Sequence, residues 1–498
     1  MPEVTLNEKP ASPLLELLRI AGPTVATMTS FTLMQFTDKW LVSRLGPEFV
    51  GAQGNGGLVS WVPQSIAMGM FTVVNTYVSQ NMGAGKPERG PAYVWNALYL
   101  SVLWYVLFLL PLPSMLPWLF GLAGVEERQI DLGVTYGSIL LYGGLLNMWT
   151  RAISQFFYGM HKASVVMVAG IAANVVNLIA SALLVFGNGP WPEDFGILGR
   201  WGAAISQALS IPALGIAGSA YGTILATALE LAIPLAVFLG PKMNASYHTR
   251  AAWKFSWEHI RDIVKTGWAA GLMFGNEMVC WGYFMVHLVS GFGKAHASAG
   301  WIAHQYMSLS FMPAVGLSVA ATAIVGKYMG MKRPDIAEKR AWLAMGLASA
   351  YMGLCGLLFV LFRHELIGFF VEDGVPEEEK LELIRLGALM LIATACFQLF
   401  DGAAMVLSGA LRGAGDTVVP GVATVVTSWG IIVGGGTLLI HLFPHLESIG
   451  AWIGAAAYII ILCLILLVRF MGGKWKKIQL LKEDGGGLAA AGTVDGVV

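Results

Sequence analysis

Long stretches without any charged residue constrain this chain more than any other feature of its sequence. A helix crosses a bilayer with about 20 apolar residues, at a rise of about 1.5 Å per residue. Eight charge-free windows are long enough: 49–85, 90–125, 163–192, 201–229, 295–326, 341–362, 417–446 and 448–468. Window 132–150 is also long enough, and the apolar stretches 20–44, 263–292 and 384–412 each contain a charge. The sequence therefore predicts an all-α polytopic membrane protein with twelve transmembrane helices.

The composition excludes several other classes of protein. Hydrophobic residues make up 56% of the 498 residues and charged ones only 12%, where soluble domains carry about 25%. A soluble multidomain enzyme, a disordered chain and a nucleic-acid-binding protein with a broad basic surface are all excluded. The chain contains no Walker A, H-E-x-x-H or G-x-S-x-G motif. We therefore expect no enzymatic activity, no cofactor and no nucleic-acid partner.

The distribution of Lys and Arg predicts the orientation. With the N-terminus placed in the cytoplasm, 21 of these residues fall on the side of the termini and seven on the opposite side. This asymmetry satisfies the positive-inside rule, so we expect a multi-pass protein of the cell membrane with both termini cytoplasmic. In segment 248–265, one helical stripe holds Trp253, Trp257, Ile260 and Val264. This pattern predicts an amphipathic helix in the cytoplasmic interface.

The two halves of the chain resemble each other. The stretch VSQNMGAGKPERG at 78–90 echoes VGKYMGMKRPDIA at 325–337, and this offset of 247 aligns Gly69 with Gly316 and Gly83 with Gly330. A repeat of six spans implies two lobes related by a pseudo-twofold axis along the membrane normal, with a central cavity, which favours a transporter over a channel. The expected divisions are a cytoplasmic N-terminal segment 1–13, an N-lobe 14–240, a cytoplasmic amphipathic linker 241–265, a C-lobe 266–470 and a cytoplasmic flexible tail 471–498.

Two acidic residues in the second half lie near the middle of predicted spans. Burying a charge in a membrane costs at least about 2.5 kcal/mol, so each needs a reason. Glu277 and Asp401 have no basic residue within a helical turn. We interpret them as a cation or proton site, because two close carboxylates can share a proton or hold a metal cation such as Na⁺. A protonated carboxyl that hydrogen-bonds across helices is the structural alternative.

Three further charges lie within or at the edge of predicted spans. Asp38 is followed by Lys39, so both a local ion pair and a functional role are open. Arg151 is expected to pair with a carboxylate of its own lobe. Glu230 is expected near the cytoplasmic end of its span, where its side chain can reach water.

Polar and aromatic side chains are candidates for lining a substrate cavity. The amides are Asn174, Asn177, Gln35 and Asn276, and the aromatic candidates are Trp281 and Tyr283. Amides also join transmembrane helices by hydrogen bonds, and aromatic rings also form belts at the membrane interface. Aromatic faces in a cavity would suit flat organic cations.

Four segments of the sequence resemble the multidrug and toxic compound extrusion (MATE) family, and the resemblance spans about 14–470. They are MQFTDKWLVSRLG at 34–46, VSQNMGAGKPERG at 78–90, FGNEMVCW at 274–281 and FQLFDGAAMVLSGALRGAGDT at 397–417. The resemblance implies two six-helix lobes in a V around a large cavity. It also implies secondary antiport of organic, often cationic, compounds against Na⁺ or H⁺.

The same resemblance assigns roles to the acids. It places the cation site at Glu277 and Asp401, as in the bacterial branch with acids in the seventh and tenth spans, and matches Asp38 to the family's first-span acid. The only ion required would be the coupling ion, Na⁺ or H⁺. The expected partners are a small organic substrate and the lipid bilayer, and we expect a monomer.

Two departures from the family pattern favour coupling in the second lobe. Trp281 stands where the family often has a second seventh-span acid, one turn on. Asn174 and Asn177 occupy the region where another branch has a fifth-span aspartate. The segment 189–210 also looks longer than the usual connection.

Two other functions are open. A flippase or exporter of a lipid-linked or polysaccharide precursor would usually need several cationic residues in its cavity, for which only Arg151 is a candidate. A membrane sensor or scaffold that transports nothing would not need unpaired acids inside its spans.

Overall fold

The computed structural model describes residues 12–122, 125–370 and 376–481, and within these ranges every regular element is a helix. Nine helical segments are long and apolar enough to cross a membrane. Three less apolar segments complete the twelve spans: α1 (Pro13–Ser43), α6 (Glu127–Tyr142) with α7 (Gly144–Gly159), and α12 (Trp257–Tyr283) with the π-turn η6 (Phe284–Val289). The predicted all-α, twelve-helix architecture is confirmed.

The remaining spans of the first half form the N-lobe together with α1, α6 and α7. They are α2 (Pro47–Phe71) with α3 (Val73–Gly83), α4 (Gly90–Trp104) with η2 (Tyr105–Leu109), α8 (Ala163–Phe186) and α10 (Ile216–Phe238). Short helices connect them: η1 (Pro87–Arg89), η3 (Leu112–Met115), α5 (Leu116–Leu122), η4 (Glu193–Phe195), α9 (Gly196–Ala208), α11 (Pro241–Tyr247) and η5 (Ala251–Trp253).

The C-lobe consists of α12 and the spans that follow it. These spans are α13 (Lys294–Gly330), α14 (Pro334–Leu361), α16 (Glu377–Ala414), α17 (Val418–Thr427) with η8 (Ser428–Gly435) and α18 (Gly436–Leu442), and α19 (Ser448–Met471). The connecting helices are η7 (Ser290–Phe292), α15 (Arg363–Gly368), η9 (Pro444–Leu446) and η10 (Lys474–Lys477).

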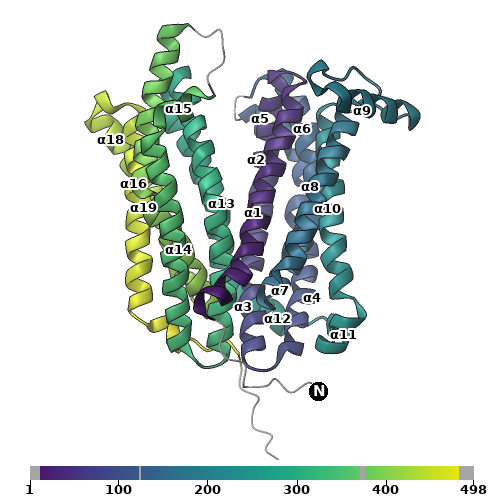
Figure 1. Ribbon diagram of the computed structural model, residues 1–498, viewed down its shortest axis with the longest axis vertical. Coiled ribbons are helices and arrows are strands. Elements are labelled where there is room, and N and C mark those ends of the chain that lie inside the picture. The colour runs from purple at the N-terminus through teal and green to yellow at the C-terminus, as the bar shows by residue number, and fades with distance from the viewer. Residues whose placement is uncertain (1–11, 123–124, 371–375, 482–498) are drawn as a thin grey trace, which may run out of the picture.

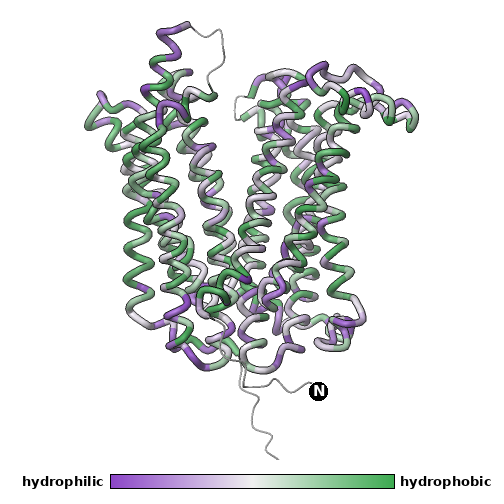
Figure 2. Tube along the Cα trace, viewed as in Figure 1, coloured by the Kyte–Doolittle hydropathy of each residue, from purple (hydrophilic) through white to green (hydrophobic). Residues whose placement is uncertain are grey.

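The two lobes meet at one end of the molecule and diverge toward the other (Figure 1). The joined end carries α3 and α11, and the splayed end carries α9 and α15. Hydrophobic residues predominate along the lengths of the helices, while hydrophilic residues gather toward the two ends (Figure 2). This distribution matches a bilayer that surrounds the middle of both lobes.

The aligned glycines of the repeat lie where the lobes touch. A Cβ atom on Gly83 would meet the carbonyl oxygen of Lys327, and one on Gly330 would meet the carbonyl oxygen of Gln80. The two contacted residues, Gln80 and Lys327, are also 247 positions apart in the sequence. The repeat therefore relates one contact to the other. A larger side chain at either glycine would push the helices apart, which explains why both halves carry a glycine at this position.

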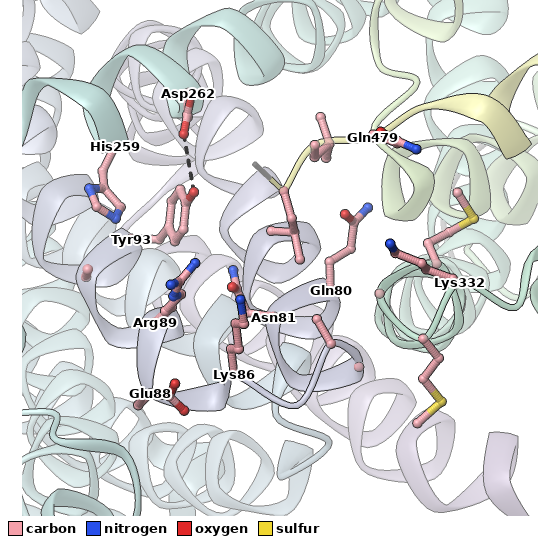
Figure 3. A pocket seen from close by; sticks show the side chains of 18 of the residues that line it. Gln80, Asn81, Lys86, Glu88, Arg89, Tyr93, His259, Asp262, Lys332 and Gln479 are labelled. Carbon is pink, nitrogen blue, oxygen red and sulfur yellow. Dashed lines mark hydrogen bonds between the residues drawn. The ribbon is translucent and has the colours of Figure 1, made fainter. Parts of the chain in front are cut away.

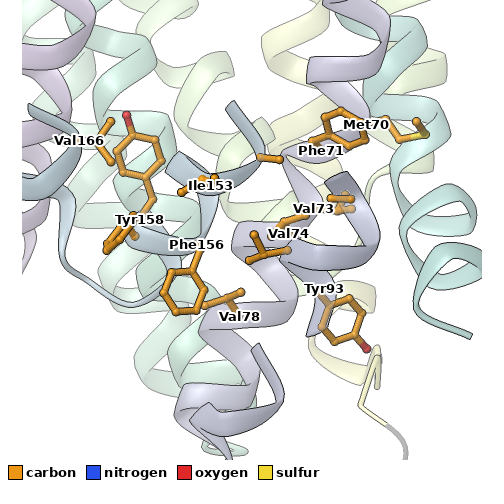
Figure 4. Packing of buried hydrophobic residues seen from close by; sticks show 14 of the residues in the cluster. Met70, Phe71, Val73, Val74, Val78, Tyr93, Ile153, Phe156, Tyr158 and Val166 are labelled. Atoms are coloured by element: carbon orange, nitrogen blue, oxygen red, sulfur yellow. The ribbon is translucent and has the colours of Figure 1, made fainter. Parts of the chain in front are cut away.

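A buried apolar core extends across the joined end. Its N-lobe part includes Phe71, Val74 and Phe156 (Figure 4), and Leu317 and Ile324 of α13 belong to the same cluster. A second cluster lies within the C-lobe around Phe397 and Trp452. The N-lobe core therefore continues into the C-lobe only through the helices that meet it at the joined end.

The sixth span begins later than the sequence predicts. Instead of a span over 201–229, the structure has the separate helix α9, a turn at Ser210 with a φ of 51°, and the span α10 from Ile216. The prediction was wrong because α9 is apolar and uncharged apart from Arg200, so hydropathy alone runs it into the next helix. Glu230 consequently lies in the interior of α10 rather than near its end.

The predicted amphipathic helix over 248–265 is interrupted. Residues 254–256 are not helical, and α12 starts after Ser256, whose Oγ accepts a hydrogen bond from the backbone amide of His259. The side chain of Asn96 holds this break open, because its Oδ1 accepts from the Ser256 amide at 2.8 Å. Trp253 and Trp257 are nevertheless both exposed, at 60% and 71%, as expected of side chains that face lipid.

Candidate ion and transport site

Asp38 lies in the interior of the N-lobe, among polar side chains from two neighbouring spans. Its carboxylate accepts hydrogen bonds from Thr223 Oγ1 of α10 at 3.0 Å, Ser181 Oγ of α8 at 3.2 Å and Asn177 Nδ2 of α8 at 3.4 Å. No lysine, arginine or histidine of the described chain forms an ion pair with it. Three neutral donors hold the carboxylate in place, but they leave its charge uncompensated.

Further oxygen atoms around Asp38 have no hydrogen-bond partner among the described residues. They are Asn177 Oδ1 and, beside the Tyr136 ring that interacts electrostatically with Asp38, Ser219 Oγ and Gln53 Oε1, all buried. Buried polar atoms are normally satisfied, so these atoms are free to accept another group. Carboxylate, amide and hydroxyl oxygens are the ligands that hard cations prefer, which gives this cluster the chemistry of a Na⁺ site.

Glu277 and Asp401 come together in the C-lobe, from α12 and α16. They interact electrostatically with each other, and Glu277 also interacts with Arg412. Neither carboxylate receives a hydrogen bond from any residue that the structure describes. Beside them on α19, the buried hydroxyl of Tyr458 has no partner. The pair therefore has a nearby cation, which the sequence pattern did not reveal, and few oxygen ligands.

Arg412 was missed as a site residue because it is the third residue from the end of α16. The charge count placed it on the cytoplasmic side, yet its side chain is only 7% exposed. Its guanidinium lies over the ring of Phe274, 5.7 Å from the centroid. It is therefore held inside the C-lobe on the side of Glu277.

Arg151 and Glu230 form a separate pair in the N-lobe. They interact electrostatically, as the predicted pairing of Arg151 within its own lobe requires. The Arg151 guanidinium also lies over the ring of Phe31, 5.0 Å from its centroid. This arginine is therefore already engaged by a carboxylate and a ring.

These groups give the two lobes the same charge balance. In the N-lobe, Arg151 offsets Glu230 and leaves Asp38. In the C-lobe, Arg412 offsets one of Glu277 and Asp401. With all carboxylates ionised, the described interior of each lobe carries one negative charge in excess. Each excess charge is costly in a membrane protein unless a proton or a metal cation neutralises it.

The other predicted side chains are distributed over several contacts. Asn174 Nδ2 donates to the Ser30 carbonyl at 2.7 Å and joins α8 to α1. Asn276 donates to Ser428 Oγ at 2.9 Å and accepts from Trp429 Nε1 at 2.6 Å. These two amides thus link helices in the way that the structural alternative predicts.

The remaining three candidates are at least partly accessible. Gln35 is exposed on α1, one turn before Lys39, and makes no polar side-chain contact with another described residue. Tyr283 is 37% exposed, with its ring 6.1 Å from that of Trp429. Trp281 meets the ring of His304 on α13 edge-on at 6.0 Å. Within the described ranges, no hydrogen bond or ring contact joins Asp38 or Glu277 to these accessible side chains.

A carboxylate at the joined end binds the lobes together. Glu16 of α1 accepts hydrogen bonds from three C-lobe side chains: Lys327 at 3.0 Å, Arg340 at 2.9 Å and the Tyr328 hydroxyl at 2.9 Å. Two cations thus compensate this carboxylate, which sets it apart from Asp38. Because its partners lie on α13 and α14, the network is broken whenever the lobes separate at this end.

Hydrogen bonds to backbone carbonyls reinforce the same contact. Three cross from N-lobe side chains to C-lobe carbonyls at 2.9 Å each: Thr24 to Gly316, Thr76 to Arg412 and Gln80 to Gly413. In the turn between α7 and α8, burial and the nearby Lys327 lower the pKa of His161 to about 4, so its ring is neutral at physiological pH. Its Nε2 lies 3.3 Å from the Ala323 carbonyl.

A cavity of about 1060 Å³ opens at the joined end, between α3, α12 and the chain after η10 (Figure 3). Basic, acidic and amide side chains line it, and on one of its walls Tyr93 donates to Asp262 at 3.2 Å (Figure 3). None of the predicted site residues is among those that line it. Its mixed charge gives no indication of a particular ligand, and it is distinct from the acid clusters within the lobes.

Within the described ranges, no three His, Cys, Asp or Glu side chains converge as ligands. A site at Glu277 and Asp401 would have only two carboxylates, so the prediction of Na⁺ there requires neutral oxygens as well. The Asp38 cluster has such oxygens.

The chain belongs to the MatE family. The family model matches residues 23–183 and, a second time, residues 273–434, so that each lobe carries one match. This double match supports the internal repeat that the sequence indicates. The family consists of membrane transporters, so the chain is not an enzyme.

Curated relatives extend over nearly the whole chain. A probable multidrug resistance protein NorM from Mesorhizobium japonicum is 26% identical over 472 residues, which cover 91% of this chain and 92% of the relative. The multidrug resistance protein NorM from Burkholderia vietnamiensis is 27% identical over 462 residues, covering 92% and 93%.

Solved structures share the fold at lower identity. A crystal structure of MATE in complex with MaL6 superposes with a TM-score of 0.80 at 18% identity, covering 94% of this chain and 98% of that one. The eukaryotic MATE transporter AtDTX14 gives a TM-score of 0.79 at 17% identity, covering 93% and 97%.

Proposed function

We propose that the protein is a secondary antiporter that exports organic compounds, often cationic, in exchange for Na⁺ or H⁺ by alternating access. The observation that carries this proposal is the excess negative charge inside each lobe. Uptake of one cation neutralises such a charge, and its release restores the charge and so biases the lobe toward another arrangement. The relatives' name, multidrug resistance protein, supports organic compounds as the class of substrate.

The joined end faces the cytoplasm in this proposal. The predicted cytoplasmic side carries most of the Lys and Arg residues, and Lys474, Lys476 and Lys477 of η10 belong to the joined end. The structure then corresponds to a state closed toward the cytoplasm. The network around Glu16 holds this state, and substrate entry from the cytoplasm requires that it open.

The two lobes differ in the cation that suits them. Asp38 with Asn177, Thr223 and their neighbours offers the oxygen ligands of a Na⁺ site. Glu277 and Asp401 lie close to each other and to Arg412, so one proton shared between them makes that trio neutral. Cation coupling through Glu277, Asp401 and Asp38 is thus compatible with either ion and needs no other cofactor.

Accessible side chains support a cavity for organic cations between the lobes. Gln35, Trp281 and Tyr283 lie on α1 and α12, which face the other lobe. Aromatic faces attract organic cations, and Tyr283 lies beside a second exposed ring, that of Trp429. Asn174, Asn177 and Asn276 would then support the cavity wall rather than contact the substrate.

Export of a lipid-linked precursor is the alternative, and it is less well supported. Phosphate recognition calls for several free cationic side chains. Arg151 interacts with Glu230 and Arg412 with Glu277, which leaves Lys39, exposed on α1 within electrostatic reach of His304, as a single candidate among the span charges named above. The expected monomer stays a prediction.

The test is efflux of a fluorescent organic cation from proteoliposomes under separate Na⁺ and H⁺ gradients. We expect at least one of the two gradients to drive efflux, and we expect Asp38→Asn and Asp401→Asn to abolish it. Glu338→Gln is the matched control, because this carboxylate is compensated by Lys476 at 2.7 Å on the surface of the joined end. Failure of both gradients with wild-type protein would contradict the proposal and favour the precursor exporter.

A further inference from the structure

The helix α9 and its flanking turns form an arm at the splayed end of the N-lobe, from Gly189 to Leu214. Figure 1 shows α9 extending sideways from the ends of α8 and α10. The arm is tied to α8 by backbone hydrogen bonds: the Asn188 amide donates to Ile211 at 2.9 Å and the Leu214 amide to Leu184 at 2.9 Å. Because both of its ends are fixed, the arm has a defined position.

Aromatic rings at the base of the arm fix it further. The ring of Trp191 packs on Gly202, where a Cβ would lie 2.3 Å from the nearest ring atom, so only glycine fits there. Phe195 stacks on Trp40 of α1 with centroids 5.0 Å apart, and Arg44 pairs with Asp194 at 2.8 Å. The arm is thus connected to α1 just beyond Asp38.

The α9 helix has three distinct faces. Its packed face consists of small residues, among them Gly199, Gly202 and Ser206, all buried. Its second face is apolar and open, with Ile197 71%, Leu198 80% and Trp201 68% exposed. At 100° per residue, Arg200 and Gln207 lie together on a third, polar face between these two.

We infer that the apolar face of α9 lies in the membrane interface at the splayed end of the molecule and contacts lipid acyl chains there. Such a set of exposed large side chains is unusual on a surface that faces water. No described charged residue belongs to this face, so nothing on it selects a soluble protein partner. A tryptophan on the apolar face beside an arginine on the polar face is typical of helices that lie in an interface.

Continuity with the surface of the spans favours lipid over a second copy of the chain. On α8, Val168, Ile171, Val175 and Ile179 form an exposed apolar stripe that leads along the helix toward the arm. This stripe is the lipid-facing side of the N-lobe, and α9 projects from its end (Figure 1). The arm therefore extends the lipid contact of the N-lobe beyond the spans.

Spin labels on the full-length protein in phosphatidylcholine vesicles test this inference. Cys355 and Cys396, which are accessible, are replaced by alanine, and labels are attached through Leu198→Cys and, as the matched control on the polar face, Gln207→Cys. We expect the ratio of collisions with oxygen to collisions with a water-soluble nickel chelate to be at least fivefold higher at 198 than at 207. Equal ratios would place the arm in water and overturn the inference.

A label at 198 that is shielded from both reagents would also overturn it, because protein rather than lipid would then cover the face. Should the cysteine variants be produced poorly, brominated lipids give an independent readout. The emission of Trp201 is obtained as the difference between the wild type and Trp201→Phe. Brominated lipids are expected to quench this emission by at least half, and absence of quenching would contradict the inference.

Discussion

The acids of the two lobes carry the same excess charge but sit in different surroundings. Asp38 is held by three neutral side chains and has unpartnered oxygens around it. Glu277 and Asp401 receive no hydrogen bond within the described structure; they interact with each other, and Glu277 also interacts with Arg412. The first arrangement is already organised around one ion, whereas the second neutralises itself most simply with one proton. Equal charge balance in the two lobes therefore need not mean the same ion in both.

Removing the excess charge of either lobe should have the largest effect. Asp38→Asn and, separately, Asp401→Asn leave a neutral lobe that gains nothing from a cation, so gradient-driven efflux should fall to the background of empty vesicles. Initial efflux rates under the driving gradient measure this. Full coupled efflux in both variants would show that neither excess charge is needed for coupling. Coupled efflux in only one of the two variants would show that a single lobe couples the ion.

Thr223→Val should have the next largest effect, because it removes one oxygen at the Asp38 cluster with little change of shape. Loss of one interaction with a charged group costs about 1.5 kcal/mol, which is roughly a tenfold change in affinity. If the ion is Na⁺, the concentration for half-maximal efflux should rise about tenfold with the maximal rate nearly unchanged; if it is H⁺, the concentration should fall, because Thr223 donates its hydrogen bond to the ionised Asp38. Thr227→Val, one turn further along α10, is the control, and an equal change there would contradict a specific role.

Glu16→Gln tests the contrast between compensated and uncompensated carboxylates. Since Lys327 and Arg340 already neutralise Glu16, the variant should leave the half-maximal cation concentration unchanged. The variant weakens the contact between the lobes at the joined end, so the maximal efflux rate should change. The change should be about threefold or less, because a partly exposed ion pair contributes only a small free energy to such a contact. A shift in cation dependence comparable to that of Thr223→Val would show that the two kinds of carboxylate are not functionally distinct.

Tyr458→Phe should have the smallest effect. The hydroxyl of Tyr458 lies by Glu277 and Asp401 without a hydrogen bond, so its loss should change the half-maximal cation concentration by less than about twofold. The titration used for Thr223→Val measures it. A tenfold rise in the half-maximal cation concentration would instead identify this hydroxyl as a cation ligand. The C-lobe site would then resemble the Asp38 site, which has neutral oxygen ligands.

Much of the fold could be predicted from the sequence, because hydropathy and the glycine repeat are local signals. The repeat in the sequence aligns Gly83 with Gly330, and in the structure these two glycines lie at equivalent points of the joined end. The boundary before α10 could not be predicted from hydropathy. The residues of α9 are as apolar as those of the span, and only their place in the fold distinguishes the two helices.

The site was only partly predictable for a related reason. Asp38 and Asn177, like Glu277 and Asp401, were singled out as polar groups in apolar surroundings. Thr223 and Arg412 were missed because a threonine in a span is unremarkable and an arginine near a helix end can reach water. What makes both relevant is their distance to acids on other helices.

The most direct test of this account is the number of coupling cations that the purified protein binds. Equilibrium binding of radioactive Na⁺ and potentiometric measurement of proton uptake can both be counted per molecule. The account predicts two cations for the wild type, one for Asp38→Asn, one for Asp401→Asn and none for the double variant. A count that is unchanged in the single variants would contradict the claim that each lobe neutralises its excess charge with one cation.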